Sequence, residues 1–292
     1  MKLAAAAYPL DWFDTWDGYV AKLSDWVARG AATGADLLVF PEYAALELAS
    51  LGGAAAAGDT QGVLAEAARH RDAVDALHLD LAARHGVHVL GGSGPVFTGA
   101  RPVNRATLYG PSGIVGHQDK QIMTRFERRD WDVVPGNALQ VFDTPFARLG
   151  VVICYDSEFP LLARALVEAG VEVLLAPSCT ETVAGFTRVR VGSMARALES
   201  QCPVVHAPLV GAAPWCAGVE MNRGRAAIYG PPDAGWPETG VLAEGDMDAP
   251  GWVVAEVDRA QIARTRADGV VLTHAHWPEQ AERLARGVVP VA

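Results

Sequence analysis

The sequence predicts an α/β fold in which two sheets face each other and helices cover their outer sides. Three observations lead to this prediction. Apolar runs of strand length alternate with segments of helical periodicity along the chain. The predicted strands are apolar on both faces, so both faces must be covered. Segment 35–42 also resembles 171–178, and 106–111 resembles 226–231. This repeat indicates one domain built from two pseudo-symmetric halves.

The first half shows clear periodicity and turn signals. One helix has its apolar residues on a single stripe that includes Trp16, Tyr19 and Leu23, Gly86 ends another helix, and a Pro-Ser-Gly turn joins two short strands. We expect, in order, a strand at 2–8, a helix at 15–33, a strand at 36–41, a helix at 62–85, a strand at 87–92, and a hairpin of 104–110 and 113–119.

The second half repeats the pattern from residue 148. Its first helix has proline in the first turn and glycine at its end, the usual arrangement. We expect strands at 148–154, 171–177, 202–208, 225–231 and 251–258, and helices at 160–170 and 187–201. The domain is predicted to cover 1–270, followed by a C-terminal tail at 271–292. His274 and His276 in that tail are interpreted as ordinary surface histidines, because no third metal ligand accompanies them.

Composition restricts the possible partners and compartment. Half of the 292 residues are hydrophobic, and the formal net charge of −10 disfavours binding to nucleic acid or to an anionic membrane. The apolar run after Lys2 stops at Pro9 and Asp11, which is short for a signal peptide, and no run approaches the roughly 18 apolar residues of a membrane span. We expect a soluble, cytoplasmic protein. The four cysteines form no C-x-x-C pair, so neither a zinc site nor disulfides are expected.

Three chemically unusual residues follow apolar strands: Glu42, Lys120 and Cys154. Ligands in α/β sheets bind beyond the carboxyl ends of the strands, which is where these residues are expected. Cys154 would lie on a turn at the start of a helix, where the positive helix end favours the thiolate. The N–H of Tyr155 would point toward the same place and could receive an oxyanion.

The chemistry becomes specific only when the three residues are taken together. Alone, Glu42 and Lys120 are read more readily as surface residues, and Cys154 equally well as a buried thiol. As a group, the carboxylate could accept the thiol proton while the ammonium favours negative charge on sulfur or oxygen. No cysteine–histidine signature is present, and His206 is interpreted as a core residue.

These residues resemble the nitrilase superfamily of carbon–nitrogen hydrolases. The similarity runs over about 1–258 through FPE (40–42), the segment ending at Lys120, and CYDSEFP (154–160). It implies a four-layer αββα sandwich, with Cys154 as nucleophile, Glu42 as general base and Lys120 as oxyanion stabiliser. Glu127 takes the place of a second family glutamate that orients the lysine or the substrate, with an exposed loop acid as the alternative. Asp119 stands where the family often has arginine. The resemblance also implies a homodimer or larger homo-oligomer.

Substrate contacts are expected from the loops after the strands. The predicted walls come from Tyr43 and Ala44, 125–131, Phe159 and 178–182; the candidate substrate-binding residues are Tyr43, Arg125, Phe159, Ser178, Cys179 and Thr180. Cys179 could equally be a structural thiol. Arg125, Arg128 and Arg129 could bind a substrate carboxylate, although a solvated charged loop is the simpler interpretation.

The favoured function is an amidase acting on a small aliphatic or carboxylate-bearing amide, without metal or cofactor. A nitrilase and an N-carbamoyl amide hydrolase are alternatives within the class. An acyltransferase and a catalytically silent interaction protein on the same fold are alternatives outside it.

Overall fold

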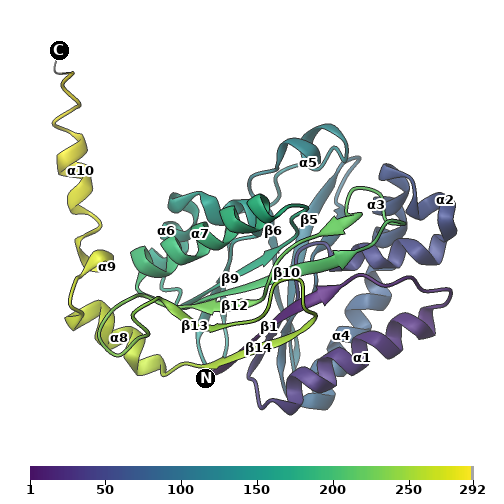
Figure 1. The fold of residues 1–292 in the computed structure, drawn as a ribbon, viewed down its shortest axis with the longest axis horizontal. Helices are drawn as coiled ribbons and strands as arrows, with labels where there is room; N and C mark the ends of the chain where they lie inside the picture. The colour runs from purple at the N-terminus through teal and green to yellow at the C-terminus, as the bar shows by residue number, and fades with distance from the viewer. Residues whose placement is uncertain (291–292) are drawn as a thin grey trace.

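The computed structural model describes residues 1–290 and contains two facing sheets joined along one edge (Figure 1). The first sheet contains β1 (Lys2–Pro9), β2 (Leu37–Val39), β3 (His88–Leu90), β4 (Gly94–Phe97), β5 (Pro102–Gly110), β6 (Gly113–Asp119) and β14 (Gly251–Glu256). The second contains β7 (Val141–Asp143), β8 (Arg148–Val151), β9 (Val173–Ser178), β10 (Val204–Ala212), β11 (Met221–Asn222), β12 (Ala227–Tyr229) and β13 (Val241–Glu244). The sheets meet where β1 pairs in parallel with β10.

The helices lie outside this pair of sheets. They are α1 (Trp16–Ala32), α2 (Gly53–Ala57), α3 (Thr60–Arg69), α4 (Arg71–His85), α5 (Arg125–Arg129), α6 (Pro160–Glu168), α7 (Val183–Ser200), α8 (Arg259–Asp268), α9 (Thr273–His276) and α10 (Glu279–Leu284), with short 3₁₀ helices η1 (Ala44–Gly52) and η2 (Cys154–Glu158). Figure 1 shows α1 and α4 on the opposite side of the strands from α6 and α7. The predicted αββα layering is therefore confirmed.

The two halves share one topology. In the first, β1, β2 and β3 are parallel and β5 joins antiparallel; in the second, β8, β9 and β10 are parallel and β12 joins antiparallel. The repeated segments 35–42 and 171–178 correspond to β2 and β9, which are the middle strands of these units. The sequence repeat thus identifies the pseudo-symmetry.

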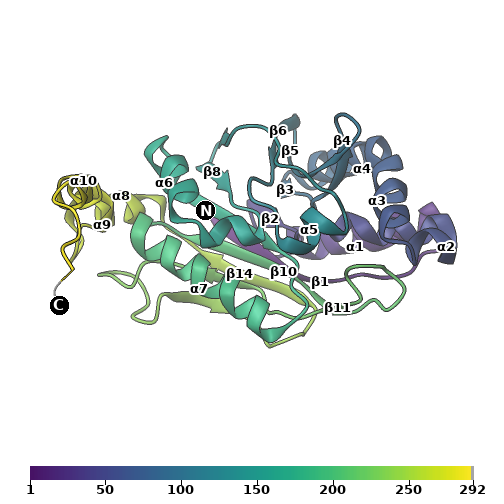
Figure 2. The ribbon, with the colours of Figure 1, turned by 90° about the horizontal axis from the view of Figure 1, so that it is seen from above.

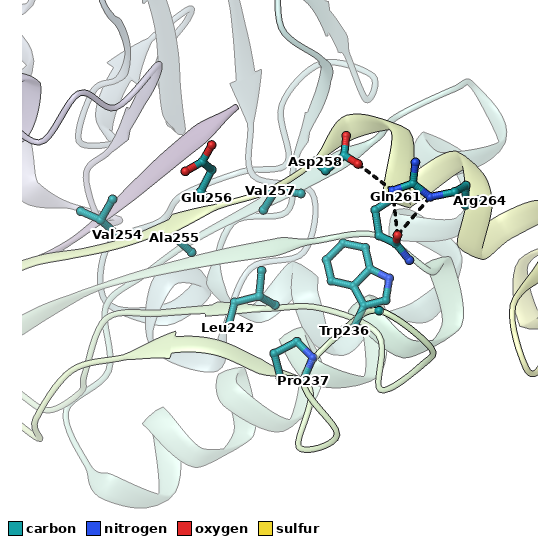
Figure 3. Close-up of a pocket in the computed structure, with 11 residues that line it drawn as sticks. Trp236, Pro237, Leu242, Val254, Ala255, Glu256, Val257, Asp258, Gln261 and Arg264 are labelled. Atoms are coloured by element: carbon teal, nitrogen blue, oxygen red, sulfur yellow. Dashed lines mark hydrogen bonds and ion pairs between the residues drawn. The ribbon is translucent and has the colours of Figure 1, made fainter.

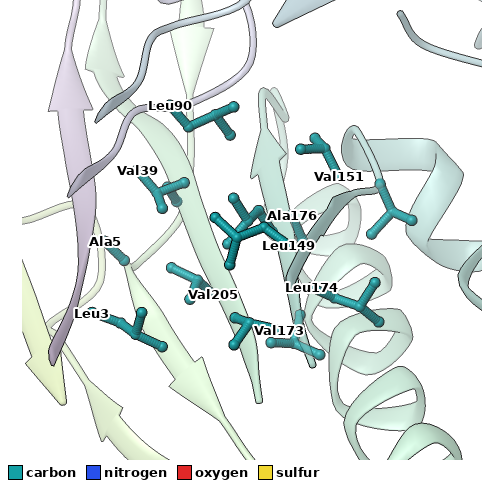
Figure 4. Close-up of a cluster of buried hydrophobic side chains, with 14 of the residues drawn as sticks. Leu3, Ala5, Val39, Leu90, Leu149, Val151, Val173, Leu174, Ala176 and Val205 are labelled. Atoms are coloured by element: carbon teal, nitrogen blue, oxygen red, sulfur yellow. The ribbon is translucent and has the colours of Figure 1, made fainter. Parts of the chain in front are cut away.

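Alternation along β1 explains the layers. Leu3 and Ala5 belong to the core shared with the second sheet, whereas Ala4, Ala6 and Tyr8 belong to the core beneath α1 and α4. Successive side chains of a strand point to opposite faces, so a strand that is apolar throughout is buried on both sides. Figure 4 shows the shared core, with side chains of β1, β2 and β3 facing those of β8, β9 and β10.

One predicted helix is wrong in its continuity. The segment 62–85 forms two helices, α3 and α4, separated at His70, which caps the end of the first and the start of the second. The His70 ring contacts the Glu66 carboxylate at 2.9 Å, and Asp59 caps α3 through the N–H groups of Gln61 and Gly62. Local side-chain bonds at both ends therefore define α3 as a separate helix.

The C-terminal segment packs at the end of the molecule remote from α2 and α3 (Figure 2). The His274 N–H donates to Gln201 Oε1 at 3.1 Å, and its carbonyl accepts from Arg164 at 3.2 Å. The start of the predicted tail is thus attached to α6 and to the end of α7. Within residues 1–290, no helix has both the length and the apolar character needed to cross a bilayer.

Candidate active site

Glu42 follows β2 and is fully buried between the two halves. Its Oε1 accepts from Lys120 Nζ at 2.7 Å and from Asn104 Nδ2 at 3.0 Å. Its Oε2 accepts from the backbone N–H of Cys179 at 3.0 Å. Because Cys179 follows β9, the middle strand of the second half, this bond links the ends of the two pseudo-symmetric strands.

Lys120 follows β6 and is also fully buried. Its ammonium donates to Glu42 at 2.7 Å and to both oxygens of Glu127, at 2.8 and 2.7 Å. A buried ammonium is tolerated when it is paired and hydrogen-bonded in this way. The hydrogen bonds to the two carboxylates therefore hold the buried Nζ atom in one position.

Glu127 is fixed by the start of α5. Thr124 caps this helix through a reciprocal capping box, in which the Thr124 N–H donates to Glu127 Oε2 at 2.8 Å. The Tyr43 hydroxyl donates to Glu127 Oε1 at 2.7 Å. Glu127 is therefore a buried, fully bonded carboxylate and not an exposed loop acid.

Cys154 lies on a sharp turn between β8 and α6. Its φ of 50° is in the left-handed region, which is uncommon for residues other than glycine. The turn is held by Asp156, whose carboxylate accepts the N–H groups of Gln121 at 3.1 Å and Ile122 at 2.8 Å. Asp156 thereby attaches the Cys154 turn to the segment that follows Lys120.

The protonation state of Cys154 differs from the thiolate expected from the sequence. Burial, with a further contribution from Glu42, raises the pKa of the Cys154 thiol well above its usual range, although Lys120 opposes this. The predicted thiolate is therefore not the resting form, because desolvation outweighs the helix end, which here belongs to only one short 3₁₀ turn. The sulfur needs a base when it attacks.

The two carboxylates have different affinities for a proton. Burial raises the pKa of Glu42 to about 7, even though Lys120 lowers it in part. Burial also acts on Glu127, but the charge and hydrogen bonds of Lys120 and the Thr124 N–H keep its pKa below the usual range. Two carboxylates with pKa values driven apart by their surroundings are suited to different roles. Glu42 is the one suited to exchange a proton near neutral pH.

Glu42, Lys120, Glu127 and Cys154 all line one cavity of about 470 Å³, a volume typical of small-molecule sites. Its remaining walls include an aromatic group, the segment 179–181 and the segment 218–222. A separate cavity of about 500 Å³ lies between β14, α8 and Trp236 (Figure 3). There Arg264 donates to Asp258 at 2.6 Å and to Gln261 at 2.8 Å, and none of the lining residues among 1–290 is a cysteine or lysine.

The predicted substrate-binding residues divide into two groups. Tyr43, Cys179 and Thr180 line the cavity of the four catalytic candidates. Arg125 is exposed outside it, and Phe159 packs on Tyr155 with ring centroids 4.9 Å apart. Ser178 is buried against His206 at 2.8 Å, because it still belongs to β9 and points into the core. His206 is indeed a core residue, and burial lowers its pKa to about 3.

Several contributors were not assigned from the sequence. Asn104 donates to Glu42 although the two residues are 62 positions apart in the sequence. No local motif marks Asn104 as part of the site. Asp156 lies inside the CYDSEFP motif, two residues after Cys154, so the motif itself could have indicated that Asp156 contributes to the site. The segment 218–222 lines the cavity, yet its sequence resembles an ordinary loop.

Comparison with known proteins identifies the family. The family model described as carbon–nitrogen hydrolase matches residues 2–267. The chain belongs to the carbon–nitrogen hydrolase family. This hydrolase is 33% identical over 195 residues to "Probable hydrolase YhcX" of Bacillus subtilis, covering 67% of the chain and 38% of that relative. It is 33% identical over 148 residues to deaminated glutathione amidase of Bos taurus, covering 50% of the chain and 42% of the relative. The matches thus span less than half of these relatives.

Solved structures share the fold of this hydrolase at low sequence identity. An amidase mutant from Nesterenkonia sp. AN1, with the acetamide moiety of fluoroacetamide added covalently at its active-site cysteine, superposes with a TM-score of 0.70 at 21% identity, covering 99% and 97% of the two chains. Saccharomyces cerevisiae Nit3, of the nitrilase superfamily, gives a TM-score of 0.69 at 18% identity, covering 91% and 93%. Both similarities support the αββα architecture.

Proposed function

We propose that this hydrolase is an amidase with Cys154 as its nucleophile. One observation carries the proposal. Lys120 Nζ lies within 2.8 Å of both Glu42 and Glu127, and all three residues line the same cavity as the Cys154 thiol. A nucleophile, a base of suitable pKa and a fixed cation next to one space are the groups that acyl transfer requires.

In the proposed acylation, Glu42 takes the Cys154 proton as sulfur attacks the carbonyl carbon of an amide. Negative charge develops on the carbonyl oxygen, where the Lys120 ammonium and the Tyr155 N–H stabilise it. Glu42 then gives its proton to the leaving nitrogen, and the carbon–nitrogen bond breaks to leave a thioester. Glu127 stays ionised and holds Lys120 in position.

In the proposed deacylation, a water molecule attacks the thioester carbon. Glu42 accepts a proton from this water, and the carbon–sulfur bond breaks to release the acid and restore the Cys154 thiol. The same carboxylate thus acts as base, acid and base again, which suits a pKa near 7.

The names of the relatives favour an amide over a nitrile. Among the similar proteins are deaminated glutathione amidase and Omega-amidase NIT2-B of Xenopus laevis, the latter 30% identical over 131 residues. A nitrilase or an N-carbamoyl amide hydrolase would use the same nucleophile, so the substrate panel must include all three classes.

The test is ammonia release from primary amides, nitriles and N-carbamoyl amines by the wild-type chain and by Cys154→Ala. We expect release from amides, its loss in the variant, and an acyl adduct on Cys154 in the intact mass of trapped enzyme. An adduct on Cys179 instead, or full activity of Cys154→Ala, would overturn the mechanism. Turnover of nothing in the panel would favour a silent binding protein.

We also propose that the hydrolase is a homodimer. Large apolar side chains remain exposed on α6 and α7, namely Leu161, Val183, Val191 and Leu198. Such a surface is typical of a protein–protein contact. Sedimentation velocity should give twice the chain mass, and Val191→Glu should shift the sample to monomer.

A further inference from the structure

The cavity is acidic beyond its catalytic groups. Four glutamates are among the described residues that line it, Glu42, Glu127, Glu181 and Glu220, against one lysine, Lys120. Glu181 and Glu220 are exposed, and neither appears in an ion pair among residues 1–290. Resting on the proposed amidase function, we infer that the substrate is an amide with a cationic group at its far end.

Apart from Lys120, the described lining of the cavity contains no cationic side chain that could pair with a substrate carboxylate. Lys120 is the one basic side chain in the described lining; it is paired with Glu42 and Glu127, and the proposed reaction uses it at the carbonyl oxygen and not at the far end of the substrate. Arg128 lies outside the lining and donates to the Met123 carbonyl at 2.9 Å. The carboxylate-bearing amide considered from the sequence is therefore disfavoured, because a carboxylate here would face like charges without a partner.

A second feature of the wall also suits a cation with an apolar stem. Tyr43, Phe126 and Trp131 form an edge-to-face aromatic group along the cavity, with centroids 4.8 Å apart for Tyr43 and Trp131 and 5.0 Å for Phe126 and Trp131. Phe126 remains 39% exposed, so part of its ring is open to an occupant. Aromatic faces attract ammonium and guanidinium groups and also bury methylene stems.

The two unpaired acids stand on fixed backbone. Glu181 lies between Thr180 and the start of α7, and Thr180 is tied to Arg223 by bonds of 2.8 and 2.9 Å in both directions. The Glu220 carbonyl accepts the Ala213 N–H at 2.9 Å just before β11. Carboxylates on anchored segments at the opening of a cavity concentrate cationic substrates there. The nearby Arg223 is paired with Asp248 and does not neutralise them.

The experiment compares three primary amides of equal length that differ only at the far end. These are δ-aminovaleramide, with an ammonium; caproamide, with a methyl group; and adipic acid monoamide, with a carboxylate. We expect kcat/KM to fall in that order. In about 1 M salt, where the Debye length is about 3 Å, the difference between the ammonium and methyl compounds should shrink.

Variants then locate the origin of the preference. Glu181→Gln and Glu220→Gln should each lower the ratio of kcat/KM for δ-aminovaleramide over caproamide by about two- to fivefold, as expected for exposed charges, and the double variant by about tenfold. The matched control is Glu238→Gln, which removes an exposed carboxylate outside the cavity and should leave the ratio unchanged. Circular dichroism verifies that each variant is folded.

The outcomes separate this inference from the proposed function. Suppose that caproamide is hydrolysed and that kcat/KM for the carboxylate compound equals or exceeds kcat/KM for the ammonium compound. This result would overturn the cationic-substrate inference and leave the amidase proposal standing. A cation preference that persists in the double variant would overturn the role of Glu181 and Glu220. Turnover of none of the three amides would contradict both proposals.

Discussion

Lys120 Nζ donates to both carboxylate oxygens of Glu127 but to only one oxygen of Glu42. This asymmetry accounts for the different protonation of two acids that share one cation. Glu127 receives additional bonds from Tyr43 and from the Thr124 N–H and remains ionised. Glu42 is left with a higher pKa and lines the same cavity as Cys154.

The first prediction concerns the pH dependence of activity. In the free enzyme, kcat/KM for a neutral amide should rise through about pH 7, because Glu42 must lose its proton before it can act as a base. Glu42→Gln should lower kcat by a factor of about 10²–10⁴. The matched control is Glu47→Gln, a buried acid paired with Lys22 outside the cavity, which should retain the profile. A profile flat between pH 5 and pH 8 would argue against Glu42 as the base.

The second prediction concerns stability and the sign of its pH dependence. The pKa of Glu42 is raised from 4.5 to about 7 on folding, so the folded state binds more protons between these values. The contribution of Glu42 to the free energy of unfolding is therefore fully present below about pH 4.5 and is lost as pH rises through about 7. Glutamine cannot ionise, so the Glu42→Gln variant does not lose this contribution as pH rises. The Tm of the variant minus the Tm of the wild type should therefore increase by a few degrees from pH 5 to pH 8.

Differential scanning calorimetry of wild type and Glu42→Gln at both pH values gives the Tm values that test this prediction. A difference in Tm between Glu42→Gln and wild type that stays constant with pH would contradict the raised pKa.

The third prediction uses the left-handed backbone at Cys154. Alanine must keep the strained φ of 50°, whereas glycine adopts it without a Cβ clash. Because both variants lack the nucleophile, their comparison isolates backbone strain. Cys154→Gly should be at least as stable as Cys154→Ala, by up to about 1 kcal/mol, although glycine costs more entropy at ordinary positions. Urea denaturation of the two proteins gives the difference, and a clearly less stable glycine variant would exclude strain at this turn.

The fourth prediction separates positioning from stability at Tyr43. Tyr43→Phe removes a buried donor to the Glu127 carboxylate, which should cost about 1–3 kcal/mol of stability. It should also lower kcat about tenfold, because Glu127 then holds Lys120 less firmly. Tyr8→Phe is the matched control, since it removes a similar buried bond to Glu47 away from the cavity. Equal activity losses in the two variants would indicate general destabilisation.

The sequence alone determined the architecture and the identity of the main chemical groups. Alternating strand and helix patterns, and the repeat of 35–42 in 171–178, were sufficient for two facing sheets with pseudo-symmetric halves. Glu42, Lys120 and Cys154 were recognisable because each follows a strand in a distinct local motif. Periodicity and motifs are local properties, so a single chain displays them directly.

Only the tertiary structure decided how these groups behave. The bond from the Cys179 N–H to Glu42 joins residues 137 positions apart, and no local pattern encodes it. The thiol form of Cys154 and the pKa of Glu42 depend on burial, which is a property of the assembled sheets. The lining also excludes Arg125 and includes Glu220, because loops distant in sequence form one wall. Desolvation and convergence of distant segments arise only when the chain has packed.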